Sequence, residues 1–307
     1  MTFKKLFFYL QNPKDFAFRL LARSAKWFRD DKKYINLKWW VVNFYGHEKI
    51  DWDNPTTFNE KLNWLKIYNR KPVYTQMADK SQAKKIVADK VGPQYVAKLY
   101  GVYKSFDDID FEKLPQQFVL KCTHDSGSMI ICKDKAKLDK AKAKEKLEKA
   151  LKKEYFYISR EWPYKNIKPQ ILAEEFLNDH TGNELRDYKF WCFNGVPRVV
   201  YFTNKADNIY ENFYDLDFRP LDISHGFTRH KPEFTKPDTL EEMASLAAKL
   251  SEGIPFVRID FFNVDGKVYF AEFTFFDWGG FMPFTKKQWD VRLGEWISLP
   301  KMENSGE

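Results

Sequence analysis

Apolar residues recur at helical spacing in the first ninety residues of the chain. Residues 1–45 place Lys and Arg among bulky apolar side chains, which predicts basic, aromatic helices. Thr57 stands three residues before Glu60, the spacing of a capping box, so a helix is expected to begin there. A second helix is predicted over residues 73–91, because the apolar pattern continues to a stop signal at Gly92.

Short apolar runs bounded by turn residues predict strands in the remainder of the chain. Residues 115–122 and 129–132 are expected to form a hairpin around a polar loop that contains glycine. Further strands are predicted at 170–177, 185–193, 196–203, 255–263 and 267–275, and helices at 136–153 and 238–252. Because the strands follow one another in hairpins rather than in strict βαβ order, the pattern predicts an α+β fold.

Composition places the chain among globular proteins with acidic partners. Its 307 residues, 44% hydrophobic and 31% charged, predict about two domains. The net charge of +8 favours phosphates, uronic-acid polymers or anionic lipid. No nucleic-acid-binding motif accompanies the charge, so nucleic acid is not an expected partner. Three cysteines without a CxxC pair argue against disulfides and structural zinc, which fits a reducing cytosol.

The N-terminal segment raises the question of membrane contact. Its first ten residues resemble a signal peptide, but the apolar run is short and is interrupted by residues 11–15. No stretch approaches the ~18 apolar residues that a membrane span requires. The basic aromatic helices fit either an interfacial membrane helix or, as we favour, a helix packed on the rest of the protein. We expect a cytoplasmic protein and leave open a peripheral contact at the inner face of the membrane.

The strongest chemical signal lies in the last two predicted strands. Arg258 and Asp260 share one face of the first strand, and Glu272 and Thr274 share one face of the second, because side chains alternate. A two-residue turn at residues 265–266 would place the two acids on opposite faces. A loop one residue longer would place them together, so we predict an odd-length loop.

Two carboxylates on one face require a cation. At about 5 Å they repel each other by roughly 3 kcal/mol at an effective dielectric constant of about 20. Arg258 alone would form a structural ion pair beside an isolated acid. Oxygen ligands without His or Cys also suit Mg²⁺, which proteins usually bind through one or two carboxylates and substrate phosphates. The spacing alone leaves both interpretations open.

Three further segments carry charged side chains in apolar surroundings. Lys121 ends an apolar strand and precedes loop 123–128, whose hydroxyl and N–H groups can bind phosphate, although no Walker A motif is present. Glu174 and Glu175 end another strand, and they could be either part of a binding site or simply exposed carboxylates at a strand end. Lys189 lies inside an apolar strand, where an unpaired ammonium is costly, so it requires a carboxylate or a phosphate.

The order of these segments resembles the ATP-grasp superfamily. More closely, the chain resembles the TupA-like amidoligase branch, which is associated with bacterial surface-polysaccharide and teichuronopeptide synthesis. The similarity covers about residues 55–285. It rests on FNEKLNWLKIYNR, ADK, FVLKCTHDSGS, REWPYKNIKP, LRDYKFWCFNG and AEFTFFDWGG. The resemblance implies an α+β ATP-grasp fold, with two lobes gripping ATP and a helical, basic N-terminal extension. The implied parts are a helical region at 1–75, a small lobe with the phosphate loop at 76–177, a large lobe with the metal site at 178–300, and a tail at 301–307.

The resemblance also implies which residues bind ATP. Lys80 and Lys121 would contact its phosphates, with loop 123–128 as a lid and Lys189 as a further phosphate contact. The loop residues concerned are Ser126, Gly127 and Ser128. The adenine-binding hinge between the lobes would consist of Glu174, Glu175 and Leu177.

The implied metal and catalytic residues lie in the last two strands and beyond them. Asp260 and Glu272 would bind Mg²⁺, with Thr274 at a third position that is usually Asn, a departure that leaves the number of metal ions open. Arg258 and Lys121 would be catalytic, Arg258 by stabilising the transferring phosphoryl group and the tetrahedral intermediate. A loop at residues 279–280 would close over the acyl phosphate.

The implied activity is that of an ATP-dependent carboxylate–amine ligase. ATP would convert a carboxylate into an acyl phosphate, which an amine then attacks. A uronic-acid-type carboxylate of an acidic glycan and an amino acid or other amine are the expected substrates, with ATP and Mg²⁺ as cofactors. The alternatives are a glycosyltransferase, for which Asp215 and Asp217 form a DxD-like motif, an ATP-grasp kinase, and a non-catalytic membrane-surface protein.

Overall fold

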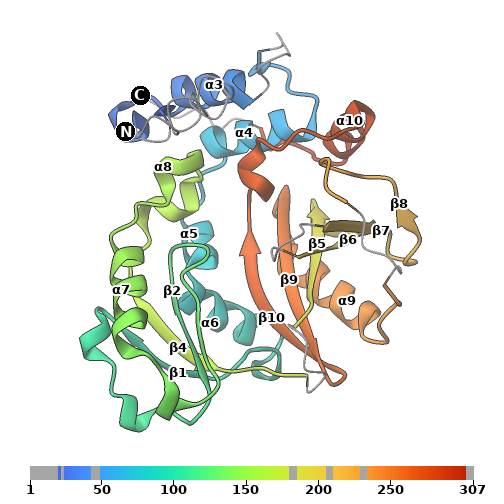
Figure 1. Ribbon diagram of the computed structural model, residues 1–307. Helices are drawn as coiled ribbons and strands as arrows, with labels where there is room; N and C mark the ends of the chain where they lie inside the picture. Colours follow the sequence, from blue (N-terminus) through green and yellow to red (C-terminus); the bar gives the residue numbers. More distant parts are fainter. Residues whose placement is uncertain are drawn as a thin grey trace.

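The protein contains two antiparallel sheets, as Figure 1 shows for the computed structural model. The structure describes residues 20–21, 24–42, 49–179, 185–204, 210–228 and 234–301. The four-stranded sheet has the order β1 (Leu99–Tyr103), β4 (Ile171–Glu175), β2 (Phe118–Cys122), β3 (Ile130–Cys132). The six-stranded sheet has the order β10 (Lys267–Thr274), β9 (Phe256–Val264), β5 (Asp187–Phe193), β6 (Val196–Asn204), β7 (Tyr210–Tyr214), β8 (Pro220–Leu221). The predicted α+β class and the predicted hairpin of β2 and β3 are confirmed.

Helices surround both sheets. Between the sheets lie α5 (Pro72–Ala78) and α6 (Lys80–Val91), both of which contact β10 (Figure 1). The four-stranded sheet packs against α7 (Lys140–Leu151), and the six-stranded sheet against α9 (Leu240–Ser251). Further α-helices are α3 (Asp31–Val42), α4 (Phe58–Tyr68), α8 (Phe156–Ser159) and α10 (Lys287–Glu295).

Each sheet has its own hydrophobic core. Phe118 and Leu120 of β2 pack with Leu147 of α7 in the smaller core. The larger core joins the six-stranded sheet to α4, α6 and α9, and Trp191 is fully buried in it. Many of the aromatic residues that make up 18% of the chain therefore fill cores, because large rings bury the most apolar area per residue.

The predicted helix over residues 73–91 is two helices, which corrects the sequence interpretation. Asp79 has an extended backbone, with φ −73° and ψ 112°, and separates α5 from α6. Its carboxylate accepts hydrogen bonds from the backbone N–H of Ser81 at 2.9 Å and of Gln82 at 3.3 Å. Asp at this position caps a new helix instead of continuing the old one. The capping box of Thr57 and Glu60 is confirmed at the start of α4.

The described part of the N-terminal region packs on the rest of the protein. Ile35 of α3 is buried with Ile50 and Phe281. The ammonium of Lys38 donates hydrogen bonds to the backbone carbonyl of Ile158 and the hydroxyl of Ser159, each at 2.7 Å. In the described residues no helix is long and apolar enough to span a membrane. Residues 1–19, where part of the predicted basic helices falls, lie outside the described chain.

The hairpin of β9 and β10 has a two-residue turn, so the prediction of an odd-length loop is wrong. Val264 pairs with Lys267, and the intervening Asp265 and Gly266 have φ of 52° and 81°. An Asp-Gly pair favours this turn because both positions require a left-handed backbone. The two acids nevertheless share a face, since the pairing shifts by one residue between Phe270 and Glu272.

A β-bulge at Ala271 causes this shift. Phe270 pairs with Phe261, Ala271 is the extra residue, and Glu272 pairs with Asp260. A bulge inserts one residue without a partner, and the side chains beyond it therefore point to the opposite face. The bulge therefore places Asp260 and Glu272 on the same face, which is the arrangement that we expected from the longer loop.

Candidate active site

One row of side chains crosses four strands on the same face of the six-stranded sheet. Glu272 lies opposite Asp260, Asp260 opposite Lys189, and Lys189 opposite Tyr201. In the next row, Thr274 and Trp191 flank Arg258 on either side. Directly opposite residues of antiparallel strands have adjacent side chains, so three predicted metal-site residues and Lys189 meet here.

Arg258 is the centre of this group. Its Nε and Nη2 donate to the two carboxylate oxygens of Asp260 at 2.7 Å each, and Nη2 also donates to Glu272 at 2.9 Å. Its Nη1 donates to Asp277 at 2.6 Å. The side chain is only 12% exposed, so all three ion pairs are largely shielded from water. A bidentate arginine–carboxylate pair fixes both partners in one plane.

Asp277 was not identified from the sequence as a site residue. It opens a short 3₁₀ segment (Asp277–Gly280) after β10, and it is 3% exposed. Its carboxylate accepts from Nε1 of Trp191 at 3.0 Å and from the hydroxyl of Tyr201 at 3.0 Å, besides Arg258. The signal that could have found it is an acid placed among aromatic residues, where burial demands partners.

Helix α4 supports the segment that carries Asp277. The ammonium of Lys66, which is fully buried, donates to the backbone carbonyl of Gly279 at 2.5 Å, and Asn63 donates to that of Gly280 at 2.6 Å. Both glycines have positive φ, and a Cβ at Gly280 would lie 3.1 Å from that of Leu62. The loop that we expected to close over the substrate is thus bonded to α4 in this structure.

Electrostatic effects differ between the two predicted metal ligands. Burial opposes ionisation of Glu272, but the positive charges of Arg258, Lys80, Lys189 and Lys121 outweigh it and lower its pKa to about 2. Burial dominates at Asp260 and raises its pKa to about 6, against the opposing effect of Arg258. The four cations that act on Glu272 include all three lysines predicted to contact phosphates.

Lys121 and Lys189 each have a carboxylate partner. The Lys121 ammonium lies 2.5 Å from Glu174, whose other oxygen is 2.7 Å from Lys84. Lys189 lies 2.6 Å from Asp187 and 4.0 Å from Asp260. Lys84 was missed, although its place four residues after Lys80 puts both on one face of α6.

The predicted adenine hinge lies at the end of β4. Glu174 is buried rather than exposed, because its carboxylate pairs with two lysines. Glu175 is half-buried and accepts a hydrogen bond from the backbone N–H of Lys98 at 3.1 Å. Leu177 follows the strand and is half-buried as well. The assignment of these residues to an adenine site stays a prediction.

Loop 123–128 is partly fixed by its own hydrogen bonds. The Ser128 hydroxyl donates to Asp125 at 2.6 Å and accepts from the backbone N–H of Cys122 at 3.0 Å. Lys80 donates to the backbone carbonyl of Asp125. Ser126 and Gly127 are exposed at the tip, and a Cβ at Gly127 would meet no atom within 4 Å.

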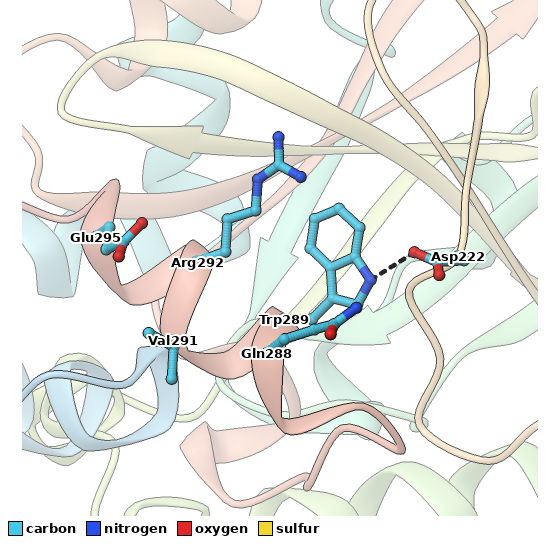
Figure 2. Close-up of a pocket in the computed structure, with 6 residues that line it drawn as sticks. All are labelled: Asp222, Gln288, Trp289, Val291, Arg292 and Glu295. Atoms are coloured by element: carbon cyan, nitrogen blue, oxygen red, sulfur yellow. Dashed lines mark hydrogen bonds between the residues drawn. The ribbon is translucent and has the colours of Figure 1, made fainter.

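A small cavity of about 10 Å³ adjoins the site between α5, α6 and β10. Its lining comprises Met77, Ala78, Lys80, Ala83, Tyr164, Ala271, Glu272 and Phe273. A more open hollow lies on α10 (Figure 2), where Nε1 of Trp289 donates to Asp222 at 2.7 Å. The residues around that hollow include none of the predicted site residues.

A family model described as TupA-like ATPgrasp matches residues 60–298. The chain belongs to the TupA-like ATP-grasp family. This membership confirms the predicted ATP-grasp fold and the class of ATP-grasp ligases. No curated protein is significantly similar to the chain in sequence.

Several solved structures are similar at low identity. D-alanine–D-alanine ligase from Bacillus anthracis complexed with ATP is 13% identical, over 64% of this chain and 53% of that one, with a TM-score of 0.38. The corresponding ligase from Helicobacter pylori is 15% identical, over 78% and 69% of the chains, with a TM-score of 0.40. The D-cycloserine synthetase DcsG is 13% identical, over 73% and 70%, also at 0.40. The chain thus spans about half of the first of these proteins, and similarity at this level says nothing about its substrates.

The residues present fit a magnesium ion, which the ATP-grasp family implies. Within the described chain, no group of three or more His, Cys, Asp or Glu side chains could bind a metal. Asp260 and Glu272 provide two carboxylates, which matches the usual number for Mg²⁺ bound with substrate phosphates. Arg258 donates to both oxygens of Asp260 and to one oxygen of Glu272, but each carboxylate oxygen has two lone pairs, so coordination positions remain on both acids.

The DxD-like motif of the alternative interpretation has a structural explanation. Asp215 lies 2.8 Å from the guanidinium of Arg219, and Asp217 also pairs with Arg219. Asp217 and Arg219 are each 72% exposed in their side chains. The motif forms a surface ion-pair turn between β7 and β8, apart from the row of site residues.

Proposed function

We propose that this TupA-like ATP-grasp protein is an ATP-dependent carboxylate–amine ligase that acts through an acyl phosphate. One observation carries the proposal: Arg258 bridges Asp260 and Glu272 on one face of the sheet. The positive charges of Lys80 and Lys121 act on the same glutamate. An exposed ion pair would not require four positive charges to act on one carboxylate.

The lysines and the loop would bind the phosphates of ATP. Lys80 lies beside the exposed tip of the loop formed by Ser126 and Gly127, and its ammonium already bonds that loop. Lys121 would exchange its contact with Glu174 for a phosphate, while Lys84 keeps the carboxylate neutralised. The hinge would bind adenine through Glu174, Glu175 and Leu177, and Lys189 would be a further phosphate contact.

Asp260 and Glu272 would bind Mg²⁺, with Thr274 beside them. The ion would supply positive charge against the phosphate oxygens, which phosphoryl transfer requires. All five N–H donors of Arg258 are engaged in hydrogen bonds, so it would release the donor that now bonds Glu272 in order to stabilise negative charge that develops on the phosphoryl group or the tetrahedral carbon. Phosphorylation makes the substrate carboxylate electrophilic, and exclusion of water protects the product of that step.

The substrates we propose are a uronic-acid-type carboxylate in bacterial surface-polysaccharide biosynthesis and an amino acid or other amine. The net charge of +8 supports an acidic glycan as the carboxylate donor. We further propose a cytoplasmic location with peripheral contact at the membrane. The exposed Trp27 and Trp40, 83% and 55% accessible, support this contact, and Lys26 directly precedes Trp27.

An ADP-release screen tests the proposal. Amino acids are combined with glucuronate- and galacturonate-containing glycans in the presence of ATP and Mg²⁺. We expect ADP release that requires both substrates and falls at least about 100-fold in Asp260→Asn and Lys121→Ala. Asp217→Asn, at an exposed ion pair, is the matched control and should behave as wild type.

Three outcomes would contradict the proposal. ADP release that survives Asp260→Asn and Lys121→Ala would remove the proposed site. Formation of a phosphorylated glycan without an amine would identify a kinase instead. Stabilisation by a UDP-sugar but not by ATP and Mg²⁺, in a thermal-shift measurement, would favour a glycosyltransferase.

A further inference from the structure

Glu161 is a buried carboxylate to which the ligase site has so far given no role. It lies between α8 and a 3₁₀ segment (Trp162–Asn166), and it is 7% exposed. Its backbone carbonyl accepts from Tyr164 at 3.1 Å. In the described parts of the chain, no side chain or backbone N–H donates a hydrogen bond to its carboxylate. Its two oxygens are not among the fully enclosed unpartnered atoms of the described chain, so they can accept hydrogen bonds from water or from a ligand.

Backbone packing connects Glu161 to the reaction centre. A Cβ at Gly279 would lie 3.5 Å from Oε1 of Glu161, so the two are in contact range. Gly279 follows Asp277 by two residues, and Asp277 binds Arg258 at 2.6 Å. Glu161 therefore faces the segment that fixes the guanidinium of Arg258.

Two tyrosines lie near both Glu161 and Glu272, because the charges of both acids act on their phenol groups. The rings of Tyr155 and Tyr164 lie 4.8 Å apart, and Tyr164 lines the cavity that Lys80 and Glu272 also line. Burial raises the pKa of both phenols, and the negative charges of Glu161 and Glu272 raise it further. The two hydroxyls thus stay protonated and lie within electrostatic reach of both carboxylates.

Lys66 does not donate a hydrogen bond to the Glu161 carboxylate. Its ammonium is near enough to affect the ionisation of Glu161, yet it donates to the side-chain oxygen of Asn63 at 2.8 Å and to the carbonyl of Gly279. Lys38 adds a second positive charge in the neighbourhood. The two lysines therefore offset the negative charge of Glu161 while they donate hydrogen bonds to other acceptors.

We propose that Glu161, with the hydroxyls of Tyr155 and Tyr164, binds the ammonium group of the amine substrate and accepts its proton. This inference rests on the ligase function proposed above. A carboxylate and two phenol oxygens offer acceptors to an ammonium, which has only donors. Burial raises the pKa of the Glu161 carboxyl above its ordinary value, which favours acceptance of a proton and supports the assignment.

The proton and electron pairs balance in this scheme. The amine enters as an ammonium, and one proton passes to Glu161, which frees the nitrogen lone pair. The nitrogen attacks the acyl carbon, so a C–N bond forms while the C–O bond to phosphate breaks. The second proton leaves the nitrogen with the departing phosphate, and the products are an amide and hydrogen phosphate. Glu161 then returns its proton to solvent.

Separate measurement of the two half-reactions of Glu161→Gln tests the assignment. The amino acid and uronate that give the fastest ADP release in the screen serve as substrates, and hydroxylamine traps the acyl phosphate when the amino acid is omitted. We expect hydroxamate formation within about twofold of wild type, because activation of the carboxylate does not need the ammonium site. With the amino acid we expect its KM to rise at least about tenfold and kcat to fall about 10–100-fold.

Two further variants make the result interpretable. Glu154→Gln makes the same change at a half-exposed residue paired with Lys26, and it should leave both half-reactions unchanged. Tyr164→Phe removes one proposed acceptor and should raise the KM of the amino acid about threefold to tenfold, without loss of hydroxamate.

The inference is overturned if Glu161→Gln leaves the KM and kcat for the amino acid unchanged. It is also overturned if both half-reactions fall equally with a lower melting temperature, because Glu161 would then only support the fold. If the wild type releases no ADP with any pair of substrates, the proposed ligase function itself fails, which is a distinguishable result.

Discussion

Replacing Asp277 with asparagine should weaken both the stability of the protein and the placement of Arg258. All three partners of the Asp277 carboxylate are donors: Arg258, Trp191 and Tyr201. An asparagine side chain offers one oxygen and one NH₂ group. In either orientation its NH₂ group faces a donor, so at least one buried hydrogen bond is lost.

The expected cost follows from the type of bond that is lost. A hydrogen bond to a charged group contributes about 1.5–3 kcal/mol. Complete loss of a buried ion-pair partner costs about 3–5 kcal/mol, but Asp260 and Glu272 still neutralise Arg258 in the variant. We therefore expect a loss of about 2–3 kcal/mol, which lowers the melting temperature by about 5–10 °C. Displacement of the guanidinium by about 1 Å would lower kcat by up to about 100-fold.

Differential scanning calorimetry and ADP release measure the two effects in Asp277→Asn. Asp217→Asn is the matched control, because Asp217 also pairs with an arginine but is 72% exposed, and it should leave both quantities unchanged. If Asp277→Asn matched wild type in melting temperature and kcat, the assignment of Asp277 as the residue that positions Arg258 would be refuted.

Three shorter predictions concern other parts of the site. Asp79→Ala removes the cap of α6 and should cost about 1 kcal/mol in urea unfolding, and it should raise the KM for ATP because Lys80 begins that helix. Deletion of Ala271 removes the bulge but keeps Glu272 opposite Asp260, so Mg²⁺-dependent activity should persist; complete loss in a folded variant would contradict the register argument. Burial opposes ionisation of Glu174, but the positive charges of Lys121 and Lys84 outweigh burial and lower its pKa. Its ion pairs therefore stabilise the fold above the ordinary pKa of 4.5, and this stabilisation is lost as the pH falls below that value. The melting temperatures of wild type and Glu174→Gln should therefore converge on acidification from pH 7, and a constant difference would refute this linkage.

The local elements were largely predictable from the sequence, because they depend on neighbouring residues. The capping box at Thr57, the β2–β3 hairpin and the strands that carry Arg258 and Glu272 follow from short-range patterns. The order of the motifs also identified the family, since several signals in sequence are more specific than any one of them.

The errors arose where two local rules competed. Asp79 stands in an apolar helical pattern, and its capping geometry prevailed over that pattern. Asp265 and Gly266 favoured a two-residue turn, and the bulge four residues beyond Lys267 then shifted the pairing so that Glu272 lies opposite Asp260. Bulges have weak sequence signals, because the extra residue can be almost any side chain.

Long-range partners were not predictable in the same way. Asp277 and Glu161 acquire their importance from residues that are distant in sequence, Arg258 in one case and the backbone of Gly279 in the other. Pairing of Lys84 with Glu174 likewise depends on how α6 packs against β4. Burial and proximity of this kind are properties of the assembled fold rather than of the pattern along the chain.

The support of residues 279–280 by α4 affects how mutants of this family member should be interpreted. Asn63 and Lys66 lie about two hundred residues before the carboxylates at the centre of the site, and neither touches them, yet both bond the segment behind Asp277. Variants at these positions should therefore lose turnover as active-site variants do, and a screen for inactive clones would recover them together. Inactivity of such clones should not be taken as evidence that Asn63 or Lys66 contacts the substrate. The variants would instead have lost hydrogen bonds to the segment that holds Arg258 in position.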